Sequence, residues 1–451
     1  MKYCPLVASL ALAALAVVGL VASAAASPLN LAPPDEPGPF HVGFTTFSAE
    51  MSSGRVTQIR VFYPTDEAAD DQTRYTIQTP VGTYQLDSPL WAVEGAQALP
   101  GQFPLVVHDH GGGPAGPGFQ HVSQANVHEL MASHGIVTAV ALHSANPIAR
   151  VRDLPLVIDA LLARGAAGDD LLTDSIDPTR IGISGVSAGG AAAIGAAGGV
   201  AANGIAADPR IKAMVLYEPG RPPNYALADA STIAIPYLVM GGTQHANGPA
   251  TATLFEATVL ATPRIRVSNP GATHFSYLAN LAAEIDQARE QALLANPDMP
   301  EPLTTLTASN AAAARAYEAW NWGEILFPVI GPGVGSGRNF SDRVGVNSVR
   351  SLDLDQDGFT DSPPFMTTDA FVLEPTIRAE VMVPMIKLYT VAFWKTFLEG
   401  DRRYMPYLTP GYAIRNDLEA FVEIEVPEPA SLALLALGLP LLLPRRAAQR
   451  S

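Results

Sequence analysis

Two patterns of apolar residues follow one another along the chain. In 41–47 and 56–63, β-branched and aromatic residues alternate with polar ones, which is typical of antiparallel strands. After a loop rich in Pro and Gly, apolar residues form short unbroken runs instead, which is typical of strands buried on both faces. These runs lie at 104–108, 136–142, 180–184, 212–217, 236–240 and 264–268.

Helical patterns separate the unbroken runs, at 126–134, 154–164 and 189–202. An alternation of strands and helices predicts an α/β fold, in which helices cover both faces of a parallel sheet. We therefore expect residues 38–277 to form a mostly parallel central sheet that begins with two antiparallel strands.

The alternation stops near residue 278. Helical patterns at 281–295 and 310–322 lead into a segment rich in Gly and Asp, and a long helical pattern follows at 377–398. We interpret 278–370 as a long insertion and 371–420 as the C-terminal helical part of the core. Two interpretations of the insertion stay open: a cap over the functional site, or a surface elaboration without a functional role.

The first 26 residues have the order of a secretory signal peptide. Lys2 precedes an apolar run over 5–22, and small residues end at Ala26, as at an A-x-A-like cleavage site. An uncleaved membrane anchor is the alternative. Cys4 is the chain's single cysteine and lies in this leader, so we expect the exported protein to contain no disulfide.

The last residues, 426–451, contain a second targeting pattern. Pro427-Glu428-Pro429 precedes an apolar run over 430–443 and a basic end, and this run is shorter than the about 20 residues of a spanning helix. The three parts in this order resemble the PEP-CTERM sorting signal of Gram-negative bacteria. The resemblance implies a tail that holds the protein at the inner membrane until an exosortase-type enzyme cleaves it, and then delivery to the cell surface or the extracellular matrix.

The net negative charge of the chain argues against one class of partner, nucleic acids. The chain has 43 acidic and 27 basic residues, a formal net charge of −16, which repels phosphate backbones. We therefore expect no nucleic-acid partner. A composition with 48% hydrophobic residues indicates a globular protein rather than a disordered one. It leaves the oligomeric state open.

Candidate chemistry begins at Gly185-Val186-Ser187-Ala188-Gly189, which matches G-x-S-x-G, the strand-to-helix elbow of α/β-hydrolases. The motif alone is weak evidence, but here it follows the run at 180–184 and opens a helical pattern, as the elbow requires. We predict Ser187 as the nucleophile. The alternative is a serine that only caps a helix.

A serine nucleophile needs a base and an acid that orients it. His274 follows the run at 264–268, in the loop where this fold places its base, whereas most other histidines precede the elbow and His245 lies in a different loop. Residues 241–273 contain no aspartate and only Glu256 as an acidic residue. We therefore predict Glu218, at the end of the run at 212–217, as the acid; a solvated carboxylate is the alternative.

The same chemistry needs amide donors for an oxyanion. His110-Gly111-Gly112-Gly113 follows the run at 104–108, where a hydrolase places its second donor loop. We predict Gly111, Gly112 and Ala188 as the oxyanion-hole residues, with a plain flexible turn as the alternative to the glycine loop.

Together these features resemble the platelet-activating-factor acetylhydrolase and dienelactone-hydrolase-like branch of bacterial α/β-hydrolases. The resemblance covers 38–276 and resumes over 377–408, and it implies an acid after the earlier strand, where Glu218 lies. Glutamate in place of that family's aspartate, and the long insertion, are departures. The segments that resemble the family are Gly38-Pro39-Phe40-His41-Val42-Gly43, Val61-Phe62-Tyr63-Pro64, Ala132-Ser133-His134-Gly135, Arg152-Asp153-Leu154, the elbow, Phe393-Trp394-Lys395 and Leu398-Glu399-Gly400-Asp401.

The sequence therefore predicts acyl transfer from a carboxylic ester, with no cofactor required for catalysis. Lipid esters, polyesters and small aryl or acyl esters all stay open as substrates. Two other functions stay open. One is a surface or matrix protein that keeps the fold and only binds partners, and the other is an amidase or peptidase with the same residues.

A separate acidic segment has the spacing of a calcium loop. Its oxygen donors would occupy positions 1, 3, 5, 7 and 9 around Gly358 at position 6, while position 12 is Pro364 instead of the usual glutamate. We predict a structural Ca²⁺ ion; an acidic turn without metal is the alternative. The predicted ligands are Asp353, Asp355, Asp357, Phe359 (through its carbonyl) and Asp361.

We expect millimolar calcium to raise Tm relative to chelator, because a ligand that binds only the folded state stabilises it by mass action. The missing glutamate predicts weak binding. Differential scanning calorimetry of the wild type and of Asp355→Asn measures the effect, and the variant should lose the calcium-dependent increase. Identical wild-type curves with calcium and with chelator would contradict the calcium loop.

Overall fold

The computed structural model describes the residues from 31 to 277 with several gaps, and a few segments beyond them. The described residues are 31–79, 82–111, 119–144, 146–168, 170–220, 230–242, 254–258, 260–261, 263–270, 272, 274–277, 349–350, 365–366, 379–416 and 423–425. The chain divides into two units, Met1–Pro33 and Pro34–Ser451, and every element below belongs to the second.

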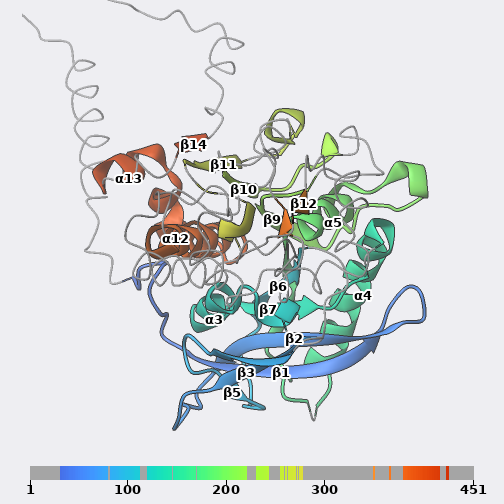
Figure 1. The fold of residues 1–451 in the computed structure, drawn as a ribbon, viewed down its shortest axis with the longest axis vertical. Coiled ribbons are helices and arrows are strands. Elements are labelled where there is room, and N and C mark those ends of the chain that lie inside the picture. The colour runs from blue at the N-terminus through green and yellow to red at the C-terminus, as the bar shows by residue number, and fades with distance from the viewer. Residues whose placement is uncertain are drawn as a thin grey trace, which may run out of the picture. The chain divides into compact units, whose positions relative to one another are not determined.

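A ten-stranded sheet forms the centre of this unit, in the order β14-β11-β10-β9-β8-β6-β7-β2-β1-β5 (Figure 1). Neighbouring strands are parallel except where β2 or β14 takes part, since each of these runs against its neighbours. The strands are β1 (His41–Glu50), β2 (Val56–Thr65), β5 (Val93–Glu94), β6 (Phe103–Asp109), β7 (Val137–Ala141), β8 (Ile176–Val186), β9 (Ile211–Tyr217), β10 (Tyr237–Gly242), β11 (Arg264–Asn269) and β14 (Glu423–Glu425).

Each apolar run expected as a strand lies in this sheet, so the predicted mostly parallel sheet with two antiparallel N-terminal strands is confirmed. The hairpin of β3 (Arg74–Thr79) and β4 (Gly82–Asp87) was not expected, since the sequence there was interpreted as a loop. A short pair, β12 (Val349–Arg350) and β13 (Phe365–Met366), lies within the predicted insertion.

Helices surround the sheet, and three of them match predicted patterns closely. The α-helices are α2 (Phe119–Val122), α3 (Ala125–Ser133), α4 (Pro147–Gly165), α5 (Ala188–Gly198), α12 (Ala379–Phe397) and α13 (Pro410–Arg415); the short 3₁₀ helices are η1 (Ala201–Asn203), η2 (His274–Tyr277) and η5 (Arg402–Leu408). Helix α4 begins seven residues before the predicted pattern at 154, because Asn146 caps its first turn and Pro147 fits the first helical position.

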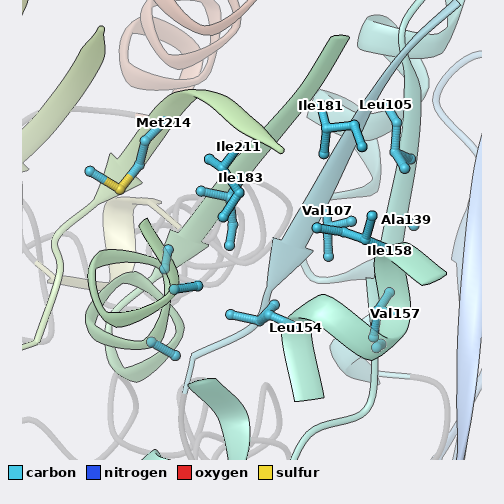
Figure 2. Packing of buried hydrophobic residues seen from close by; sticks show 14 of the residues in the cluster. Leu105, Val107, Ala139, Leu154, Val157, Ile158, Ile181, Ile183, Ile211 and Met214 are labelled. Atoms are coloured by element: carbon cyan, nitrogen blue, oxygen red, sulfur yellow. The ribbon is translucent and has the colours of Figure 1, made fainter. Parts of the chain in front are cut away.

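One face of the sheet packs on α4 and α5. Strand residues such as Val107 and Ile183 lie in one buried cluster with Leu154 and Ile158 of α4, and Figure 2 shows these side chains interleaved. The alanines of α5 bring that helix close to the strands, since their small side chains need little space. This continuous apolar layer holds β8, the strand directly before Ser187, in place.

The other face packs on α3 and α12. A β-carbon at Gly182 of β8 would lie 2.5 Å from the ring of Trp394 in α12, and the hydroxyl groups of Tyr217 and Thr390 are 3.0 Å apart. Lys395 also donates a hydrogen bond to the carbonyl of His134, at the end of α3 (3.1 Å). Helices thus cover both faces of the sheet, and α12, which follows the predicted insertion in the sequence, packs on the same face as α3.

Several predictions fall outside the described residues and stay predictions. These are the leader at 1–26, the tail at 426–451 and most of the insertion at 278–370. Within the described part of the chain, no helix is both long enough and apolar enough to cross a membrane.

We expect Gly182→Ala to destabilise the protein by about 1–3 kcal/mol, because the added methyl group must displace Trp394 from a closely packed core. The free energy of unfolding in urea measures this effect. Gly168→Ala is the matched control, since a β-carbon there meets nothing within 4 Å. Equal stability of the two variants would contradict the packing of α12 on β8.

Candidate active site

Ser187 has a strained backbone conformation between β8 and α5. Its φ of +55° and ψ of −118° lie in a region that non-glycine residues seldom adopt, at a cost of order 1–3 kcal/mol. The residue is partly exposed, whereas the last six residues of β8, 181–186, are buried. A strained turn between a buried strand and a helix is the backbone geometry that G-x-S-x-G predicts.

The two glycines of the motif are required by close backbone contacts. A β-carbon at Gly185 would lie 2.4 Å from the carbonyl carbon of Gly189, and one at Gly189 would lie 2.0 Å from the carbonyl oxygen of Asp109. Both distances are far inside van der Waals contact. The elbow therefore packs directly against the end of β6, from which the predicted oxyanion loop follows.

Two backbone hydrogen bonds join Ser187 to the turn after β9. The amide of Ser187 donates to the carbonyl of Tyr217 (3.0 Å), and the amide of Gly220 donates to the carbonyl of Ser187 (2.7 Å). The predicted acid, Glu218, lies between these two partners in the sequence. The predicted nucleophile and the predicted acid thus occupy adjoining turns at the carboxyl ends of neighbouring strands.

Glu218 is also strained and is fully buried. Its φ is +42°, its exposed fraction is 0%, and its amide donates to the carbonyl of Met240 (2.9 Å). The amide of Gly242 donates to its carboxylate. A buried carboxylate in this arrangement is held in one orientation, unlike the exposed Glu256 on the short helical segment 254–257.

Gly242, at the end of β10, contacts both Glu218 and the segment that precedes His274. A β-carbon at Gly242 would lie 2.2 Å from the carbonyl oxygen of Ala272, so these two backbones touch. The 3₁₀ helix η2 then begins at His274. Because β8, β9, β10 and β11 are parallel neighbours, the segments after them, with the three predicted catalytic residues, meet at one edge of the sheet.

Tyr277 fixes the other end of η2. Its hydroxyl donates to Asn269 Oδ1 (2.8 Å), and the side-chain amide of Gln124 donates to its carbonyl. Burial, with the charge of Glu218 nearby, raises the pKa of Tyr277 well above its ordinary value, so the hydroxyl stays protonated and remains a donor. No local motif in the sequence marks Tyr277, Asn269 or Gln124, so their contacts could not be predicted.

Of the predicted oxyanion-hole residues, Gly111 and Ala188 are described and Gly112 lies outside the described residues. A β-carbon at Gly111 would lie 3.3 Å from the Ser187 Cβ, so Gly111 is a direct neighbour of the elbow. Ala188 is the first residue of α5, where backbone amides have no partner within the helix. Both amides belong to backbone that adjoins the serine.

Three other histidines are poor candidates for a base. His108, His121 and His128 are buried, and burial lowers the pKa of each, to about 3 for His108 and His121. A general base needs a pKa near the working pH. These rings are neutral core residues; His108, for example, bonds through Nδ1 to the Ser184 hydroxyl (2.9 Å).

No group of three or more His, Cys, Asp or Glu residues in the described part of the chain could hold a metal ion. The predicted calcium ligands Asp353, Asp355, Asp357, Phe359 and Asp361 lie outside that part, so the calcium loop stays a prediction.

Comparison of the chain with protein-family models and with the curated proteins finds no match.

We expect Glu218→Gln to lower kcat at least roughly a hundredfold and to change KM little, because an orienting acid acts mainly on the transition state. Hydrolysis of a short-chain nitrophenyl ester measures both constants. Glu256→Gln is the matched control, as the same change on an exposed glutamate. A silent Glu218→Gln together with an impaired Glu256→Gln would move the acid to the segment after β10.

Proposed function

We propose that the chain is an exported serine hydrolase of the α/β-hydrolase fold that cleaves carboxylic esters. The observation that carries the proposal is the strained backbone of Ser187, with a φ of +55°, directly after β8. This serine adjoins Gly111 and is hydrogen-bonded to the turn that contains Glu218. A residue that only caps a helix needs no such strain, because ordinary caps have extended backbone angles.

The strand order supports the hydrolase fold. When the short edge strands β5 and β14 are left out and the other eight are counted in chain order, they lie in the order 1-2-4-3-5-6-7-8, and only the second is reversed. That is the arrangement of α/β-hydrolases. In it the nucleophile follows the fifth strand and the base follows the eighth, which are β8 and β11 here.

The reaction proceeds through an acyl-enzyme. His274 takes the proton from the Ser187 hydroxyl as the oxygen attacks the ester carbonyl, and the oxyanion receives hydrogen bonds from the amides of Gly111 or Gly112 and of Ala188. Collapse breaks the bond to the leaving alcohol, which takes its proton from His274. Water then attacks the acyl group by the reverse sequence, with Glu218 holding the imidazole in the productive tautomer.

The sequence signals place this activity outside the cytoplasm. The proposed leader at 1–26 directs export, and the PEP-CTERM-like tail at 426–451 holds the protein at the inner membrane before an exosortase-type enzyme releases it. The proposed substrates are small or lipid esters, and the acetylhydrolase and dienelactone-hydrolase-like branch is the proposed family.

A fluorophosphonate probe tests the proposal directly. We expect about one label per folded chain on Ser187, and we expect Ser187→Ala to lose labelling and at least roughly 10³-fold of ester turnover without unfolding. Ser184→Ala is the matched control, since Ser184 is a buried serine on β8, three residues before Ser187, and this variant should still be labelled at Ser187. Wild-type protein that folds but neither labels nor hydrolyses would favour a binding protein instead.

A further inference from the structure

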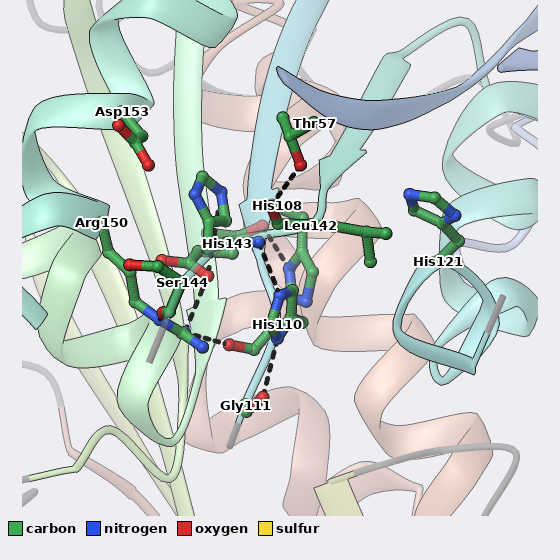
Figure 3. Close-up of polar contacts among 12 residues, drawn as sticks. Thr57, His108, His110, Gly111, His121, Leu142, His143, Ser144, Arg150 and Asp153 are labelled. Atoms are coloured by element: carbon green, nitrogen blue, oxygen red, sulfur yellow. Dashed lines mark hydrogen bonds and ion pairs between the residues drawn. The ribbon is translucent and has the colours of Figure 1, made fainter. Parts of the chain in front are cut away.

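A buried polar cluster surrounds His110, which precedes Gly111 of the predicted oxyanion loop, and is not part of the proposed triad (Figure 3). Its centre is Arg150, in the first turn of α4, whose side chain is only 1% exposed. An isolated charge at such a site is very costly, so its partners have to be close and well oriented.

Arg150 connects three backbone segments through its guanidinium. Nη1 donates to Asp109 Oδ1 (3.0 Å) and to the carbonyl of His110 (2.7 Å), while Nε donates to the carbonyl of Ser144 (2.7 Å). Asp109 ends β6 and Ser144 follows β7. One planar group therefore fixes the exits of two adjacent strands relative to α4.

The side chain of His110 continues the cluster to Gly111. Its Nε2 accepts a hydrogen bond from the amide of His143 (3.0 Å), so its Nδ1 must be the protonated nitrogen that donates to the carbonyl of Gly111 (2.7 Å). Burial, with the charge of Arg150 nearby, keeps the pKa of His110 well below its ordinary value. The ring is neutral and has one defined tautomer.

We propose that Arg150 is a positioning residue for the oxyanion loop, acting through Asp109 and His110 on the backbone of Gly111. This inference rests on the proposed function, because it assigns a role to the loop in that reaction. Gly111 touches the elbow, as a β-carbon there would lie 3.3 Å from the Ser187 Cβ. A displacement of the loop therefore changes the distance between the amide donors and the reacting carbonyl directly.

The distribution of polar contacts favours positioning over simple stabilisation. A well-packed apolar pair in place of Arg150 and Asp109 would often serve stability equally well. Here the guanidinium donates to two main-chain carbonyls, and one of them belongs to the loop itself. Amide donors at an oxyanion are effective only when they are held in place before the reaction.

The decisive variant is Arg150→Lys, which keeps the positive charge but replaces a planar fork by a single ammonium that cannot make the same three contacts. We expect kcat for a nitrophenyl ester to fall about 10- to 100-fold while KM stays within about twofold, less than the ~10²–10³ for complete loss of an oxyanion donor. The tetrahedral adduct of an aryl trifluoromethyl ketone contains the oxyanion. Its inhibition constant should therefore rise by the same factor by which kcat/KM falls.

Asp153→Asn is the matched control on the same helix. Asp153 is equally buried, but its hydrogen bonds are to Ser52 and Arg55 and none is to His110 or Gly111. We expect this variant to lower Tm and leave the kcat and the inhibition constant unchanged. If Arg150→Lys lowers Tm as the control does and changes neither kinetic constant, the positioning role is wrong and Arg150 is structural only.

Nitrogen-15 NMR of the imidazoles tests the cluster without using activity. In the wild type we expect one neutral ring, protonated at Nδ1 and not at Nε2 around neutral pH, whose signals disappear in His110→Asn. If the ring whose signals disappear in His110→Asn is instead protonated at Nε2, the inference is overturned even in an active enzyme. If instead the wild type shows the expected tautomer but has neither esterase activity nor a fluorophosphonate label, the proposed function fails, and the positioning role in that reaction fails with it.

Discussion

The conformation of the Ser187 backbone is the constraint on which the rest of the site depends. A residue with φ of +55° between a strand and a helix persists only where its surroundings oppose relaxation. Here Gly185 and Gly189 allow β6, β8 and α5 to approach closely, and two hydrogen bonds join the serine to the turn after β9. The strain is therefore balanced by packing of the sheet itself, so a change in the core directly affects the backbone of the proposed nucleophile.

Two buried charged side chains near Ser187, those of Glu218 and Arg150, each have defined hydrogen-bond partners. Glu218 is held by the amide of Gly242, and Arg150 by Asp109 and two carbonyls. Burial raises the pKa of Asp109 to about 6, although the positive charge of Arg150 acts in the opposite direction. Since water is excluded there, these contacts fix backbone positions more firmly than exposed ion pairs do.

The two helix-covered faces of the sheet differ in their packing. The face under α4 and α5 is a continuous apolar layer, whereas the face under α3 and α12 contains polar contacts such as that of Tyr217 with Thr390. Helix α12 comes from the far side of the long predicted insertion and still packs on β8 through Trp394. The strand that supports Ser187 is thus buried between segments about two hundred residues apart in the sequence.

The sequence by itself determined the strands, the parallel sheet, the elbow and the glycines that the elbow requires, because apolar periodicity and turn chemistry are local properties. It also led to Glu218 by showing that 241–273 lacks an aspartate. The β3–β4 hairpin and the contacts of Arg150 and Tyr277 appeared only in the tertiary structure. Their partners are set by which strands become neighbours, and Arg150 meets His110 because β6 and β7 pair side by side and α4 follows β7, a pairing that no single stretch of sequence encodes.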